Sequence, residues 1–237
     1  MQTRTELLLS LRQGEQMLVS IGIPLLVLVF FSLTAVLPIP DAFTEPVDFL
    51  TPGVLALAIM SSAMVSLGIG TGFERQYGVL KRLGATPLGR GRLIGAKISM
   101  VLILEVIQFA VLITAALVLG WRPEANLAAT VLALVLGTAA FAGLGLTLAG
   151  TLSGTANLAV ANGLYLLLLL LGGMVVPLDR LPGGVRVVAE LLPSSALSEA
   201  LQGALSSQIS TPVGAWLVLT AWAITMPLAA AKLFRWE

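Results

Sequence analysis

FERQYGVLKRLGATPLGRGR, residues 73–92, is a polar stretch between two long apolar runs, and it decides how the rest of the chain is arranged. It holds five of the thirteen Lys and Arg residues. Phe73, Tyr77 and Leu80 recur at helical spacing while the charged side chains fall on the opposite arc. This pattern predicts a short amphipathic helix that ends at Gly84.

A turn is predicted directly after that helix. Thr86 suits a helix cap and Pro87 suits the first position of a new helix, so residues 73–87 are expected to form a helix followed by a tight turn. A surface helix with an apolar face and a basic back is a form that another protein can bind. We therefore expect this segment to make contact with another molecule.

Composition places the chain among membrane proteins. Hydrophobic residues make up 57% of the sequence and charged residues 11%, with a mean hydropathy of +1.00. Soluble chains carry roughly 25% charged residues. The sequence has no Cys and no His, which excludes disulfides, thiolate chemistry, the usual zinc sites and a His-based catalytic triad.

The apolar runs predict an all-α polytopic membrane protein with six transmembrane helices in a single domain over residues 1–237. The first run approaches the roughly 20 residues that a crossing needs, which is longer than the apolar core of a signal peptide, so we expect it to be retained. Gly137, Gly143, Gly145 and Gly150 predict close helix packing in the fourth run. The predicted crossings are residues 17–37, 51–72, 88–120, 126–152, 157–176 and 212–234.

Two further segments are not predicted to cross. Residues 1–16 are polar enough to stay outside the bilayer, either as an interfacial helix or as a plain helical lead-in to the first crossing. Residues 178–211 contain two short helical patterns separated by Pro193, and neither is long enough to cross. We expect two outer helices that dip into the membrane or lie on it, with a seventh crossing as the alternative.

The placement of charge predicts the orientation. Six crossings put both termini on one side, together with residues 73–87 and the turn at Ser153. That side receives ten of the thirteen basic residues, whereas the other side keeps Arg122, Arg180 and Arg186. By the positive-inside rule, the N and C termini are expected in the cytoplasm.

Nucleotide-binding motifs are missing from the sequence. It contains no G-x-x-x-x-G-K-[ST] motif and no complete G-x-G-x-x-G motif. If a nucleotide drives this protein, its hydrolysis must occur on another polypeptide.

Two groups of motif residues follow one another along the chain. The first comprises Glu74–Leu83, then Ala85–Leu88 and Gly95–Lys97: an acidic-basic pair at the end of the second crossing, a Gly-x-Leu, a Thr-Pro turn and a small-x-Lys. The second runs from Val176-Pro-Leu through Leu191-Leu-Pro-Ser to Ala200-Leu201. Together they resemble the membrane subunit of ATP-binding-cassette exporters, in the type-2 permease family of drug, polysaccharide and lipid exporters. The resemblance covers essentially the whole chain.

The resemblance implies a role for the segment between the second and third crossings. In that family it is the coupling helix, which docks on the ATPase subunit. Gln76 stands where the family usually has a second acid, so the resemblance does not carry over a salt bridge at that position. The alternative for the basic residues is binding to anionic lipid head groups. The residues implied in ATPase coupling are Glu74, Arg75, Tyr77, Gly78, Leu80, Lys81, Arg82, Thr86 and Pro87.

Polar residues inside the crossings form a second set of candidates. Glu105 is the only acid within a crossing, and Gln108 lies three residues on along the same helix face. Because a charge in mid-membrane is costly, we expect these two to line a cavity or the permease–permease interface, or Glu105 to make a structural hydrogen bond to a neighbouring helix. Asn157 and Asn162 are candidates for the same path or interface, with helix caps or packing bonds as the alternative.

Taken with these features, the resemblance implies the permease subunit of an ATP-driven exporter in the cytoplasmic (inner) membrane of a prokaryote, moving a hydrophobic or amphipathic substrate such as a drug, lipid or glycan. The chain itself is expected to be no enzyme and to bind no cofactor or metal. Two ATPase subunits carrying ATP and Mg, a second permease that is identical or homologous, and membrane lipid are the expected partners, without nucleic acid.

Two other functions remain as alternatives. An ATP-independent secondary transporter or channel is disfavoured because the crossings show no chain of carboxylates and no pair of broken helices. A membrane-embedded lipid enzyme is disfavoured because the usual His, paired aspartates or metal cluster are absent from the sequence.

Overall fold

The structure, a computed structural model, describes residues 14–34, 43, 45–84, 89–124, 126–206 and 211–234. Every regular element in these ranges is a helix, as the composition predicted. The elements are α2 (Gly14–Leu33), α3 (Pro46–Ile59), the π-helix η1 (Met60–Ser66), α4 (Leu67–Gln76), α5 (Val79–Gly84), α6 (Gly89–Val118), α7 (Leu127–Thr151), α8 (Gly154–Leu171), the 3-10 helix η2 (Leu178–Arg180), α9 (Gly183–Glu190), α10 (Pro193–Leu205) and α11 (Val213–Leu233).

Among the described residues, five helices are long and apolar enough to cross a membrane: Pro46–Gln76, Gly95–Val118, Leu127–Thr151, Gly154–Leu171 and Val213–Leu233. They correspond to the second through sixth predicted crossings. The first predicted crossing falls on α2, a helix of 20 residues of which Ser20–Leu33 is the described apolar part. The multi-pass helical architecture is thus as predicted, while the count of six crossings stays a prediction.

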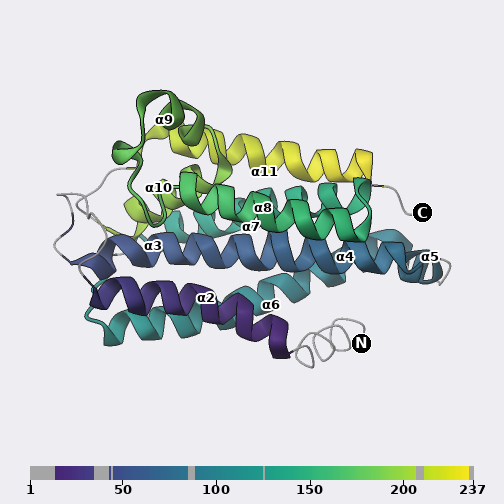
Figure 1. Cartoon of the computed structure of the whole chain (residues 1–237), viewed down its shortest axis with the longest axis horizontal. Helices are drawn as coiled ribbons and strands as arrows, with labels where there is room; N and C mark the ends of the chain where they lie inside the picture. Colours follow the sequence, from purple (N-terminus) through teal and green to yellow (C-terminus); the bar gives the residue numbers. More distant parts are fainter. Residues whose placement is uncertain are drawn as a thin grey trace.

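The second crossing forms the centre of the bundle. Its three parts, α3, η1 and α4, make one continuous rod, which we call the central helix (Pro46–Gln76), and 78% of its apolar window is buried inside the chain. The helices α2 and α6 lie along one side of it, and α7, α8, α10 and α11 lie on the other (Figure 1). The bundle is therefore built around one helix, with the other helices packed on its two sides.

Glycines let α7 approach its neighbours closely, as the sequence predicted. A Cβ on Gly145 would lie 2.6 Å from the carbonyl oxygen of Met64 in the central helix. A Cβ on Gly137 would meet Leu197 of α10, and one on Gly143 would meet the backbone at Pro227 of α11. Small residues thus set the spacing at three separate interfaces of α7.

The bundle has two distinct ends. The α5 end contains α5, the end of α4, the α7–α8 turn, the end of α11 and the start of α2 (Figure 1). The α9 end contains η2, α9 and α10, which is buried against α3, α7 and α11. Because α9 has 8 residues and α10 has 13, neither crosses, and the alternative of a seventh crossing is not seen within the described residues.

The helix predicted to begin at Phe73 differs in the structure. Phe73–Gln76 continues the central helix as the last turn of α4, and only Val79–Gly84 forms a separate helix, α5. The break lies at Gly78, which adopts a left-handed φ of +70°. The wheel pattern did not reveal this break, because a glycine that ends a helix fits the helical spacing as well as one within it.

Candidate functional site

The α5 end brings together most of the residues that the sequence singled out for coupling. Glu74 and Arg75 lie on the last turn of α4, and Leu80, Lys81 and Arg82 lie on α5. Tyr77 and Gly78 form the bend between the two helices. Thr86 and Pro87 lie outside the described residues.

Glu74 is partly exposed and forms an ion pair with a buried lysine. Its carboxylate lies 2.6 Å from the Nζ atom of Lys97 on α6, and the Lys97 side chain is 9% exposed. The Glu74 side chain is 35% exposed, so the charge that would be left buried and unpaired if the pair were broken is that of Lys97. The pair therefore ties the end of the central helix to α6.

Arg75 faces inward, towards the opposite side of the central helix. Its guanidinium donates to the carbonyl oxygen of Gly150 at 2.5 Å and to that of Leu152. Carbonyls in the last turn of a helix lack partners within the helix and carry its partial negative charge, so a cation suits this place. Arg75 thus caps the C-terminus of α7 and ties the central helix to it.

The bend at Gly78 turns the remaining residues of this end into a surface. Tyr77 is 66% exposed and its ring stacks on that of Phe73, with the ring centroids 6.0 Å apart. Val79 is exposed as well, whereas Leu80 is buried. Helical spacing predicted that Tyr77 and Leu80 share one helix face. Because the helix breaks between them at Gly78, Tyr77 is exposed and Leu80 is buried.

We call Tyr77, Val79, Lys81 and Arg82 the α5 surface, because all four side chains are exposed in the bend and helix at the tip of the bundle. It combines an aromatic ring and an aliphatic side chain with two cationic side chains. Aromatic and arginine side chains are the types enriched at the centres of protein interfaces. Tyr77 and Arg82 of the α5 surface belong to these types.

The intramembrane candidates Glu105 and Gln108 lie inside the chain. Glu105 is 2% exposed and accepts hydrogen bonds from Ser62 of η1 at 3.2 Å and from Thr138 of α7 at 2.8 Å. The amide nitrogen of Gln108 donates to the carbonyl oxygen of Ser20 on α2 at 3.1 Å. Both side chains are buried within this chain and link its helices.

The two asparagines occupy different surroundings. Asn157, near the start of α8, is buried and donates from its amide nitrogen to the carbonyl oxygen of Gly68 in the central helix at 2.7 Å. Asn162 lies five residues further along and is exposed, donating to the carbonyl oxygen of Leu158 in its own helix at 2.8 Å. The first is a packing bond between helices, and the second leaves an amide on the outside of the bundle.

Sequence reasoning missed two residues of this intramembrane set. Ser62 and Thr138 pair with Glu105, and both look like ordinary small polar residues within apolar runs. A buried carboxylate needs hydrogen-bond donors from neighbouring helices, and this requirement would have directed attention to hydroxyl side chains at the same depth. Their positions on different helices could not be read from local spacing.

A comparison with protein families decides the assignment. Residues 2–206 match the family model of the ABC-2 type transporter. The chain belongs to the ABC-2 type transporter family. Its members are membrane domains that act as transport subunits and are not themselves catalytic. No curated protein matches the chain.

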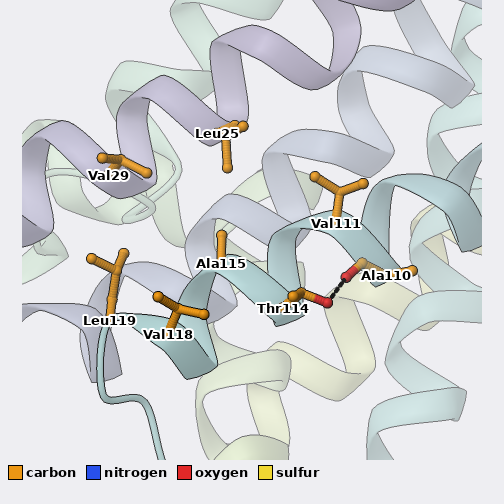
Figure 2. A pocket seen from close by; sticks show the side chains of 8 residues that line it. All are labelled: Leu25, Val29, Ala110, Val111, Thr114, Ala115, Val118 and Leu119. Carbon is orange, nitrogen blue, oxygen red and sulfur yellow. Dashed lines mark hydrogen bonds between the residues drawn. The ribbon is translucent and has the colours of Figure 1, made fainter.

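One groove of this ABC-2 membrane domain opens on its flank. It lies between α2 and α6, has a volume of about 660 Å³ and is lined by Leu25, Val29, Ala110, Val111, Thr114, Ala115, Val118 and Leu119 (Figure 2). Thr114, its one hydroxyl, bonds the carbonyl oxygen of Ala110 in its own helix. The groove therefore offers apolar surface without a free polar group.

Proposed function

We propose that this chain is the permease subunit of an ATP-driven exporter. In this proposal it moves a hydrophobic or amphipathic substrate across a prokaryotic cytoplasmic membrane, using separate ATPase subunits. The supporting observation is the two-layered build of the α5 end, where an exposed patch lies directly on ties to two other crossings. Family membership supports transport, and the lack of a nucleotide motif in the sequence supports an external energy source.

In this proposal, the exposed α5 surface and the bonds of Glu74 and Arg75 beneath it have different roles in coupling. The α5 surface docks on the ATPase, and buried Leu80 anchors α5 to the bundle. A displacement of α5 moves the end of the central helix. The Glu74–Lys97 ion pair transmits this movement to α6, and the Arg75 hydrogen bonds transmit it to α7. Glu74 and Arg75 therefore act in this proposal as internal transmission residues and do not form part of the docking face.

The assembly that fits this division contains two permeases and two ATPase subunits. The ATPases bind ATP and Mg, and their closure brings the two coupling segments together. The α5 end then lies in the cytoplasm, as the charge placement predicted. The α9 end faces the other side, and the substrate leaves between two permeases that are identical or homologous.

Cross-linking from the α5 surface tests the proposal. The chain has no Cys, so Tyr77→Cys carries a single reactive site for a photoactivatable cross-linker, and Val187→Cys on exposed α9 is the matched control at the opposite end. In membranes of the native host, we expect the Tyr77→Cys variant to capture an ATP-hydrolysing subunit and the Val187→Cys variant to capture none.

Two results would overturn the proposal. One is cross-linking of an ATPase from α9 but never from the α5 surface. The other is uphill transport by vesicles that contain this chain alone, since a secondary transporter needs no ATPase.

A further inference from the structure

The middle of the central helix contains an uncommon element. The π-helix η1 interrupts the rod between α3 and α4 over Met60–Ser66. Such wide turns are rare, appear mostly within α-helices and occur often at functional sites. Here the wide turn lies in the most buried crossing of the described chain, between the α9 end and the α5 end.

Glu105 holds this π-helix through two hydrogen bonds, which we call the clasp. Its two carboxylate oxygens accept from Ser62 of η1 and from Thr138 of α7, so one side chain of α6 joins three helices. The Ser62 hydroxyl has only one proton, yet three acceptors lie in its reach: Glu105 at 3.2 Å, the carbonyl of Ala58 at 3.0 Å and that of Ile59 at 3.3 Å. The hydroxyl can thus bond either across to α6 or back into its own helix.

The residues that follow Ser62 in η1 rest on α7. Gly145 leaves room for the backbone at Ala63 and Met64, since a Cβ there would come within 2.6 Å of the Met64 oxygen. A close backbone contact at Ala63 and Met64 next to a hydrogen bond at Ser62 that can change partner gives η1 the features of a pivot. The wide turn can bend about the Gly145 contact when the Ser62 bond changes partner.

We infer that Glu105 is a positioning residue that locks the π-helix pivot and so determines whether α3 and α4 move as one rod. With the clasp closed, a displacement of α4 at the α5 end carries α3 with it. With the clasp open, α4 bends at η1 while α3 stays in place. The inference rests on the proposed function for the origin of the displacement, while the clasp itself is a property of this chain.

Distance measurements between spin labels test the pivot directly. Because the chain has no Cys, Glu45→Cys before α3 and Arg82→Cys on α5 supply the only labelling sites, and both native side chains are exposed. The full chain is reconstituted in lipid nanodiscs without an ATPase. We expect Glu105→Leu to broaden the distance distribution about twofold, and Glu105→Gln, which retains a hydrogen-bonding side chain of the same shape, to leave it unchanged.

A matched pair on α7 separates the clasp from ordinary stability. Thr138→Val removes a hydroxyl that bonds Glu105, whereas Thr147→Val removes one that bonds only the carbonyl of Gly143 in its own helix. We expect the first to broaden the distribution and the second to leave it as it is, at similar melting temperatures. This pair also decides the matter if Glu105→Leu does not fold.

An unchanged distribution in Thr138→Val and Glu105→Leu would overturn the inference. A distribution as broad in Glu105→Gln as in Glu105→Leu would also overturn it, because the glutamine amide can still bond both hydroxyls, accepting from one at its oxygen and donating to the other from its nitrogen. Failure to find an ATPase partner would remove the proposed function but would leave these distances unaffected, so the two failures can be told apart.

Discussion

The central helix and α11 are alike in hydropathy, but the first lies at the centre of the bundle and the second at its rim. Their apolar windows have mean hydropathies of 1.9 and 1.7, yet 78% of the first and 17% of the second is buried within the chain. In a bilayer, lipid tails are as apolar as leucine, so hydrophobicity does not sort helices between centre and rim. Hydropathy indicates that a helix crosses, and other features decide where it lies.

The deciding features are small residues and hydrogen bonds. The central helix receives a bond from Asn157 at Gly68 and gives one from Ser62 to Glu105, and Gly145 of α7 packs against its backbone. α11 packs on α7 near Pro227 and on α10, and Trp222 donates a hydrogen bond to the carbonyl oxygen of Leu191, but α11 exposes Leu217, Ile224 and Leu228 on another side. Contacts from several sides hold a helix at the centre.

The largest effect is expected where α7 meets the central helix. Gly145→Leu forces a side chain into the Met64 backbone, whereas Gly163→Leu on α8 meets open space. We expect the first to lose about 3 kcal/mol of stability or to fail to fold, since backbone cannot yield as a side chain can. The second should stay within about 0.5 kcal/mol of wild type. Thermal unfolding in detergent measures both, and equal melting temperatures would contradict the contrast between centre and rim.

An intermediate effect on hydrogen exchange is expected from a basic residue in the last turn of the central helix, Arg75, compared with one in the last turn of α11, Lys232. Arg75→Gln removes a charged donor from the last carbonyls of α7, and hydrogen bonds to charged groups contribute about 1.5–3 kcal/mol. We expect amide hydrogen exchange in the last turn of α7 to become about tenfold faster. Lys232→Gln at the exposed end of α11 should change exchange nowhere in α7. Similar exchange in both variants would show that Arg75 is not a cap.

The sequence was sufficient for the multi-pass helical class and the close glycine packing of α7, because these depend on local composition and spacing. It was insufficient for the direction of side chains at the α5 end. Glu74 and Arg75 look like surface charges until Lys97 and the end of α7 are placed beside them. The break at Gly78 and the π-helix at Met60–Ser66 were likewise missed, since neither alters the hydrophobic pattern.

The smallest effect is expected at the two asparagines of α8. Asn157→Ala removes a bond to the central helix, and interhelical hydrogen bonds in membrane proteins contribute about 0.6 kcal/mol on average and about 1.7 at most. Asn162→Ala removes only a bond within α8 and should not change the melting temperature of the isolated chain. Because both changes are the same substitution in one helix, their difference isolates contact with the central helix. A larger loss in Asn162→Ala would mean that the outside of α8 contributes more to stability than its contact with the centre.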